Sequence, residues 1–317
     1  MKKRQLGRSK LQIAPLVFGG NIFGWTVDEP TSHRLLDAFI DAGFNAIDTA
    51  NVYSTWVPGH QGGESEAIIG NWLKKRKSRE KIVVATKVGK EMGDGSKGLS
   101  KANIVKSVEG SLRRLRTDYI DLYQSHDDDG TVEESETFEA YLTLIGQGKV
   151  RTIGASNFTA KRLAGTLDLS ARESFPRFES MQPCYNLYDR WEYEGELQGV
   201  CVQRKLGVIC YFSLASGFLT GKYRSKQDTS GKARGEDVEK YLDARGLRIL
   251  RALDQVAERY AATPAQVSLA WLLTRPGITA PIASATNPGQ LEQLTGAARL
   301  VLSEDSIREL TEASDRN

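Results

Sequence analysis

The sequence has few cysteines, no long apolar run and no marked excess of charge of either sign. Its 317 residues include only three cysteines, Cys184, Cys201 and Cys210, which excludes a disulfide scaffold and favours reduced thiols. Forty-three Lys and Arg oppose forty Asp and Glu, so the net charge of +3 does not indicate a nucleic-acid partner. No stretch approaches the roughly 18 apolar residues of a membrane span, and no apolar segment follows the basic residues 2–4. We therefore expect a cytoplasmic protein with no membrane partner.

Histidine is as scarce as cysteine, which limits metal chemistry. His33, His60 and His126 form no HxH or HExxH pattern. The run His126–Asp129 contains three carboxylates that could bind a cation, but such a run is more typical of a solvated acidic loop. We expect no metal site, and we regard a metal-dependent hydrolase as a remote alternative.

Short β-rich runs alternate with helical patterns along nearly the whole chain. This alternation favours parallel strands joined by helical crossovers, either in a closed barrel or in an open doubly wound sheet. The first glycine-rich strand exit, residues 18–24, is not a GxGxxG fingerprint, and the repeat occurs eight times. We therefore predict an α/β fold, a (β/α)8 TIM barrel in one domain over 1–317. The predicted strands are 16–19, 45–48, 81–87, 120–124, 150–156, 181–182, 207–211 and 278–283.

Two segments lie outside the repeat. Residues 1–15 have the pattern of a small β-hairpin, which we expect to close one end of the barrel. Residues 221–240 are polar and charged, and form either a lid or a mobile loop. Their basic residues favour a lid over an anion: Lys222, Arg224, Lys226, Lys232 and Arg234.

Polar residues follow several of the predicted strands. Asp48, Lys87 and His126 are spaced by 39 residues each, as successive strand–helix units would be. The carboxyl ends of barrel strands meet at one mouth, so these side chains converge there if Tyr53 folds back over it. Each of the four, taken singly, has an ordinary structural explanation such as a cap or loop packing.

Together these groups suit carbonyl chemistry. A tyrosine beside an ammonium has its phenolate stabilised, and we expect Lys87 to lower the pKa of Tyr53. Asp48 would hold Lys87 in place, and a neutral His126 would orient a carbonyl oxygen. The set would protonate an alkoxide formed when hydride arrives.

Several longer motifs resemble the aldo-keto reductases, which are NAD(P)H-dependent (β/α)8 oxidoreductases without GxGxxG. The resemblance extends from Leu6 to about Ala297 and includes a short likeness to potassium-channel β-subunit-like members. It is carried by Gly43–Tyr53, Gly63–Glu66 with Ile69–Gly70, Ala85–Gly89, Ile120–His126 and Gly148–Phe158.

The resemblance assigns roles to these residues. Tyr53 would be the proton donor, Lys87 and Asp48 its tuning pair, and His126 the group that orients the carbonyl. Ser156, Asn157 and Gln182 would hold a nicotinamide carboxamide, with Tyr211 stacked on the ring. The remaining expected cofactor contacts are Ser213, Leu214, Ser216, Gly217, Gly221 and Lys222 around the pyrophosphate, and Ser284, Thr286, Gln290 and Gln293 at the adenosine end.

The resemblance implies NADPH as cofactor, with NADH possible. The segment 284–294 has no lysine or arginine for a 2′-phosphate, so Lys222 or Arg224 would have to reach it. The substrate is expected to be a small aldehyde, ketone or sugar packed against Phe23, Trp25 and Trp56, and against Trp191 as a further candidate. The alternative is a nucleotide-sensing regulatory barrel resembling potassium-channel β-subunits. The oligomeric state is not readable from the sequence.

Overall fold

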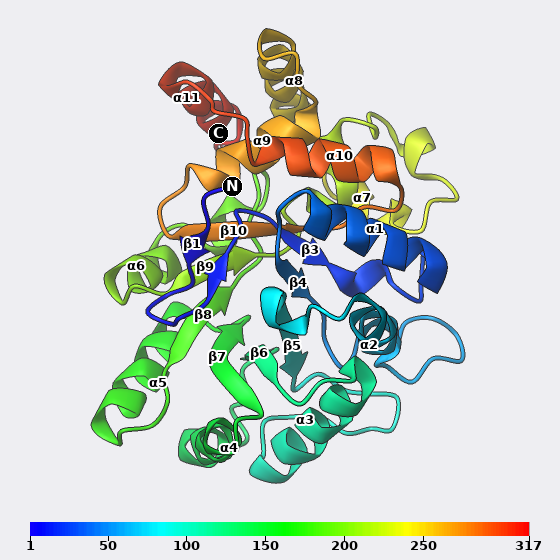
Figure 1. The fold of residues 1–317 in the computed structure, drawn as a ribbon. Coiled ribbons are helices and arrows are strands. Elements are labelled where there is room, and N and C mark those ends of the chain that lie inside the picture. The colour runs from blue at the N-terminus through cyan, green and yellow to red at the C-terminus, as the bar shows by residue number, and fades with distance from the viewer. Residues whose placement is uncertain (317) are drawn as a thin grey trace.

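A closed barrel of eight parallel strands forms the centre of the molecule, as a computed structural model that describes residues 1–316 shows (Figure 1). Each strand pairs with its sequence neighbours, and the last pairs with the first. This confirms the predicted (β/α)8 TIM barrel. The strands are β3 (Val17–Gly19), β4 (Ala46–Asp48), β5 (Val83–Val88), β6 (Ile120–Ser125), β7 (Val150–Ser156), β8 (Phe178–Gln182), β9 (Gly207–Cys210) and β10 (Ile278–Ala283).

Helices surround the barrel on its outside (Figure 1). Side-chain oxygens of Asp28, Ser100, Thr159, Thr263 and Asn287 accept backbone N–H groups at helix N-termini, so the sequence itself sets where these helices begin. None of the described helices is both long and apolar enough to cross a bilayer. The helices are α1 (Glu29–Asp41), α2 (Glu64–Arg76), α3 (Lys101–Leu115), α4 (Glu134–Gly146), α5 (Ala160–Arg172), α6 (Glu196–Gln203), α7 (Gly235–Glu239), α8 (Ala244–Arg259), α9 (Pro264–Leu273), α10 (Pro288–Ala297) and α11 (Glu304–Ala313).

The N-terminal hairpin closes the end of the barrel at which the strands begin. Strands β1 (Arg4–Gln5) and β2 (Gln12–Ile13) pair antiparallel, as predicted. Leu6 and Ile13 are almost fully buried and pack in one cluster with interior residues of the barrel strands. A Cβ atom on Gly207, at the start of β9, would lie 2.5 Å from Leu6 Cδ1. The mouth at the opposite end is therefore the end available to ligands.

The segment 221–240 is folded rather than loose. It contains the short helix η5 (Lys226–Thr229), which Ser225 and Asp228 cap reciprocally, and α7. Thr229 and Val238 are buried, and Tyr241 stacks on Phe218 at 5.4 Å between ring centroids. Of the two predicted states for this segment, the structure shows the ordered one.

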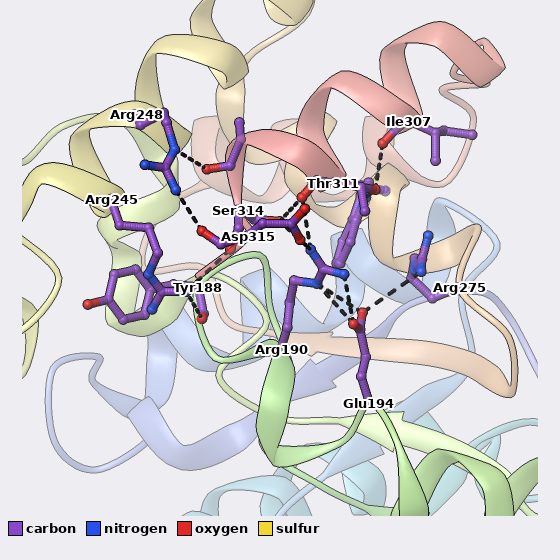
Figure 2. A network of polar contacts seen from close by, with 12 residues as sticks. Tyr188, Arg190, Glu194, Arg245, Arg248, Arg275, Ile307, Thr311, Ser314 and Asp315 are labelled. Carbon is purple, nitrogen blue, oxygen red and sulfur yellow. Dashed lines mark hydrogen bonds and ion pairs between the residues drawn. The ribbon is translucent and has the colours of Figure 1, made fainter. Parts of the chain in front are cut away.

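The C-terminal segment is anchored by arginines from elsewhere in the chain (Figure 2). Arg190, which starts η3 (Arg190–Glu192), is buried and donates hydrogen bonds to Thr311 O, Ser314 Oγ and Asp315 Oδ1 at 2.8–2.9 Å. It also pairs with Glu194 at 2.8 Å. Arg248 of α8 donates to the carbonyls of residues 313 and 315. The last helix is thereby tied to the loop after β8, which borders the mouth.

Candidate active site

The four residues predicted for carbonyl chemistry meet at the mouth of the barrel. Asp48 ends β4, Lys87 lies near the end of β5, His126 directly follows β6, and Tyr53 reaches back from the turn after β4. The Lys87 ammonium donates to Asp48 Oδ2 at 2.6 Å, to Thr49 O at 2.8 Å and to the Tyr53 hydroxyl at 2.8 Å. The His126 ring lies edge-on to Tyr53, with 6.0 Å between ring centroids.

Burial governs the charge states of this group. It lowers the pKa of His126 well below its ordinary value, with help from the Lys87 charge, so the imidazole is neutral. It also lowers the pKa of Lys87, and the Asp48 carboxylate opposes that shift. The Lys87 ammonium at 2.8 Å and the Asp48 carboxylate at 3.4 Å thus stand around the Tyr53 hydroxyl with opposite charges.

The prediction that the pKa of Tyr53 is lowered is wrong. Burial, and then the Asp48 charge 3.4 Å away, raise the pKa of Tyr53 well above its ordinary value instead of lowering it. Sequence reasoning considered the ammonium and left out the loss of water around the phenol. The consequence is a Tyr53 that retains its proton at neutral pH.

Two amides hold the second oxygen of Asp48. Gln182, at the end of β8, donates to Asp48 Oδ1 at 2.9 Å, and Gln124 of β6 donates to the same oxygen at 3.4 Å. Both side chains are buried. Gln124 was not predicted as a site residue, because only the barrel register brings it beside Asp48.

Comparison with known proteins agrees with this arrangement. Residues 15–315 match the Aldo/keto reductase family. The chain belongs to that family. It is 34% identical over 320 residues to the uncharacterized oxidoreductase YrpG of Bacillus subtilis, covering 98% of this chain and 95% of the relative. It is 31% identical to the aldo-keto reductase YhdN of Bacillus subtilis, covering 95% and 88%, and to Protein tas of Escherichia coli, covering 98% and 96%. Aldo-keto reductases are oxidoreductases that act on carbonyl groups.

The residues expected around a nicotinamide in this aldo-keto reductase lie together, beside the group formed by Asp48, Tyr53, Lys87 and His126. Ser156 ends β7 and donates to Gln182 O at 2.9 Å. Asn157 adopts the left-handed conformation and donates to His126 O at 2.9 Å, and the Tyr211 hydroxyl donates to Asn157 Oδ1 at 2.8 Å. An aromatic face and amide groups close to Tyr53 and His126 fit a nicotinamide ring in chemical type.

The loop after β9 has the features of a phosphate cradle. Ser216 and Gly217, in η4 (Ala215–Thr220), both have positive φ, as does Gly221 after it. Gly217 has a φ of 97°, and a Cβ atom there would lie 3.5 Å from Lys222 Nζ, so an ammonium lies beside this turn of the backbone. Such a turn with one cation fits a pyrophosphate. Ser213 and Leu214 precede this turn, and the Ser213 hydroxyl donates to Cys210 O at 3.0 Å.

The residues expected to contact the adenosine of the cofactor are neutral, and several of them form hydrogen bonds with other protein groups. The Ser284 hydroxyl lies 2.7 Å from Gly19 O and 2.8 Å from Asn21 Oδ1, and its single proton is shared between these two acceptors. Gln290 accepts hydrogen bonds from Thr286 through Oε1, and Gln293 is exposed on α10. Arg224 forms a bidentate pair with Asp254 at 2.8 and 2.9 Å.

The expected aromatic wall is only partly present. Trp25 and Trp56 lie edge-to-face at 5.7 Å, and Trp56 lies 6.0 Å from the Tyr53 ring. Phe23 corrects the expectation: it is fully buried and stacks on Phe18 at 5.5 Å, because the chain turns it inward after β3. Trp191 is 38% exposed and lines a pocket of about 520 Å³ with Asn157 and Tyr211.

A groove and an acidic loop complete the surroundings. The groove, of about 530 Å³, leads from Trp25 at the mouth to Thr286. In the acidic loop, Asp128 pairs with Arg162 at 2.7 Å, and Asp129 accepts the Leu99 N–H at 2.8 Å. Within residues 1–316, no three His, Cys, Asp or Glu side chains gather as metal ligands.

Proposed function

We propose that the chain is an NADPH-dependent reductase that converts an aldehyde or ketone to the alcohol, with Tyr53 as the proton donor. The main observation in support is the contact of 2.8 Å between the Lys87 ammonium and the Tyr53 hydroxyl. Asp48 accepts a second hydrogen bond from the same ammonium, and a neutral His126 lies beside Tyr53. Membership of a carbonyl-reducing family supports the same reaction class.

The residues divide the reaction between them. A bound nicotinamide cofactor supplies the hydride to the carbonyl carbon. Neutral His126 donates a hydrogen bond that orients the carbonyl oxygen, and Tyr53 transfers its proton to that oxygen as negative charge develops there. An alkoxide is a much stronger base than a phenolate, so the raised pKa of Tyr53 still permits the transfer. Lys87 then stabilises the phenolate that remains.

The holding of Asp48 has a role in this scheme. Gln182 and Gln124 donate hydrogen bonds to Oδ1 of Asp48, which leaves Oδ2 of Asp48 to accept from Lys87. These contacts hold the ammonium next to the Tyr53 hydroxyl. Ser156, Asn157, Gln182 and Tyr211 are the proposed nicotinamide contacts, and the turn at Gly217 with Lys222 is the proposed phosphate contact. The pyrophosphate is common to NADPH and NADH, so the Lys222 ammonium, which forms no ion pair within residues 1–316, would favour NADPH only by reaching the 2′-phosphate; NADH is the possible substitute.

Two substitutions test the proton donor. Tyr53→Phe keeps the ring and removes the proton, so turnover of every carbonyl should vanish. Lys87→Met should also abolish turnover while nucleotide affinity stays within about tenfold, or about 1.4 kcal/mol. Near-wild-type turnover of Lys87→Met would contradict the scheme. Far-ultraviolet circular dichroism of both variants controls for folding.

Titration with NADPH and NADH, followed by tryptophan fluorescence, tests the cofactor. Trp25 and Trp56 lie at the mouth, so quenching is expected on binding. Micromolar affinity for NADPH and much weaker affinity for NADH would support the cofactor assignment. Tight nucleotide binding with negligible turnover of many carbonyls would instead favour a nucleotide-sensing regulatory barrel.

A further inference from the structure

The start of α2 contains two polar side chains that are completely buried and have no role in the reaction proposed above. They are Ser65 and Glu66, in the motif Gly63–Glu66. Glutamate is almost never fully buried unless it is paired. A buried hydroxyl or carboxylate needs a partner inside the protein, so the contacts of these two residues show what this turn holds in place.

Glu66 fixes the start of α2 to the barrel and to the next helix. Its Oε1 accepts the Thr86 hydroxyl of β5 at 2.6 Å, and its Oε2 accepts Arg114 Nε of α3 at 2.7 Å. Gly63, with a φ of 93°, leaves room for the Arg114 side chain, since a Cβ atom there would lie 2.3 Å from Arg114 Nε. The position of Ser65, between Gly63 and Glu66 in the chain, is therefore fixed relative to β5.

The Ser65 hydroxyl joins the ends of two barrel strands. It lies 2.8 Å from Gly20 O, directly after β3, and 2.8 Å from the Thr49 hydroxyl, directly after β4. A carbonyl oxygen can only accept, so the single Ser65 proton goes to Gly20 O and the Thr49 hydroxyl donates to Ser65 Oγ. The backbone N–H of Thr49 donates to Ala85 O of β5 at 2.8 Å. Thr49 is thus held through both its side chain and its backbone.

The carbonyl group of Thr49 is one of the partners of the Lys87 ammonium. An ammonium has three N–H donors, and in Lys87 all three are used. They go to Asp48 Oδ2 at 2.6 Å, to Thr49 O at 2.8 Å and to the Tyr53 hydroxyl at 2.8 Å. Two fixed acceptors determine where the third N–H points. Glutamine amides hold the Asp48 carboxylate, and Ser65 holds the residue that supplies the other acceptor.

We propose that Ser65 is a positioning residue for the Lys87 ammonium and acts through the Thr49 carbonyl. This rests on the proposed function, because that function gives the ammonium the task of stabilising the Tyr53 phenolate. Without the Ser65 hydroxyl, Thr49 loses the contact that fixes its side chain, and the ammonium loses a fixed acceptor. The third N–H then points at the Tyr53 hydroxyl for less of the time. Reduction of the carbonyl should slow, because a small displacement of an aligned group lowers the rate steeply.

The test measures the chemical step in Ser65→Ala and in Thr49→Val. Each protein is loaded with NADPH and mixed with 4-nitrobenzaldehyde, and oxidation of NADPH is followed over a single turnover. Both variants should be slower than wild type on the order of tenfold, while the Kd for NADPH and the KM for the aldehyde stay within about threefold. Thr49→Val keeps the carbonyl that accepts from Lys87 and removes the hydroxyl that contacts Ser65, so it also serves if Ser65→Ala does not fold.

Ser170→Ala is the matched control. The Ser170 hydroxyl is likewise buried and donates to a backbone carbonyl, Phe175 O at 2.9 Å, but it lies in the last turn of α5, which runs from the mouth toward the base of the barrel. Its removal should cost a similar amount of stability and leave the rate within about twofold. An equal loss of rate in Ser170→Ala, or an unchanged rate in Ser65→Ala, would overturn the proposal.

The double variant Ser65→Ala/Thr49→Val tests whether the two residues act together. If Ser65 acts through Thr49, the double variant should be at most about twofold slower than the slower single variant. Effects that multiply to about a hundredfold would show that the two residues act independently, and would overturn the proposal.

If wild-type protein reduces no carbonyl, the proposed function fails, and nuclear magnetic resonance of the nucleotide-free protein decides the positioning role. The ammonium signal of Lys87, in protein labelled with nitrogen-15 at its lysine side chains, is identified by its loss in Lys87→Met. Ser65→Ala and Thr49→Val should shift or broaden this signal, because the ammonium loses a fixed acceptor, and Ser170→Ala should leave it in place. An unchanged signal in Ser65→Ala would overturn the proposal.

Discussion

At the scale of single residues, the site depends on side chains that water does not reach. Lys87 and Gln124 are fully buried, and Asp48 nearly so. Each of their polar atoms is therefore dependent on a partner within the barrel. The sequence placed Asp48, Lys87 and His126 at strand ends, since that follows from counting strands. Gln124 was missed because strand register, not residue type, brings it to the carboxylate.

Two predictions from the sequence, the exposure of Phe23 and the pKa of Tyr53, were wrong because both depend on the folded state. Phe23 follows a strand like the other candidates for the aromatic wall, and nothing in its local pattern shows that the chain turns it toward Phe18. The pKa of Tyr53 was expected to fall because a nearby ammonium is visible in the sequence pattern, whereas burial is a property of the folded state. Contacts between the ends of neighbouring strands could be predicted from the order of the strands, whereas the degree of burial of each side chain could not.

The neutral state of His126 predicts a pH dependence of stability. The unfolded chain takes up a proton at this histidine near pH 6.5, but the folded protein, whose His126 pKa is far lower, does not. The free energy of unfolding should therefore fall as the pH falls below 6.5, by about 1.4 kcal/mol per pH unit through this group. Urea unfolding at pH 7.5 and 5.5 measures it, with His126→Asn as the reference. Identical pH slopes for the two proteins would contradict the neutral assignment.

At the scale of helices and strands, the regular alternation made most elements predictable. Strands β7 and β10 have the predicted bounds. Strand β8 begins at Phe178, earlier than the predicted 181, because Glu179 and Ser180 dilute the apolar signal. The short helices η5 and α7 were not predicted individually. They are held by tertiary contacts such as the burial of Val238, which no local pattern contains.

Two helix glycines should respond oppositely to alanine. A Cβ atom on Gly70 of α2 would lie 2.0 Å from Arg114 O of α3, so Gly70→Ala should force the helices apart and cost about 1–3 kcal/mol. Gly165 of α5 is exposed with no atom within 4 Å of the added carbon, and Gly165→Ala should gain about 0.5–1 kcal/mol from helix propensity. Thermal unfolding of both variants tests the pair. A stabilised Gly70→Ala would show that the two helices are not in close contact.

At the scale of the whole molecule, the arginine cluster at the C-terminal segment joins parts of the chain more than a hundred residues apart. Arg190 is the centre of this cluster (Figure 2). The neighbouring Trp191 lines the pocket beside Tyr211. Such long-range pairing has no signature in sequence, so the sequence reasoning did not anticipate it.

Removing Arg190 should destabilise the whole barrel. Arg190→Met removes the main ion pair of the largely buried Glu194 carboxylate, which keeps only the Tyr185 hydroxyl at 2.6 Å and the Arg275 guanidinium at 3.8 Å, and the expected loss is about 3 kcal/mol. The urea midpoint should fall with an unchanged slope. As a control, Lys97→Met breaks an ion pair with Glu91 in which both side chains are more than half exposed, and should change stability by less than about 1 kcal/mol. Equal small effects in both variants would show that the cluster contributes no more than a surface pair.

The hairpin at the base of the barrel bears on how the protein could be attached to a solid support. Its strands are fixed below the barrel by the burial of Leu6 and by hydrogen bonds from Arg4 to carbonyls of Leu273, Ile278 and Thr279. A tether joined at Met1 would leave the molecule at the end opposite to Tyr53, so a bead or electrode would not obstruct diffusion into the mouth. A tether at the other terminus would pull on the Arg190 cluster and on the loop bearing Trp191.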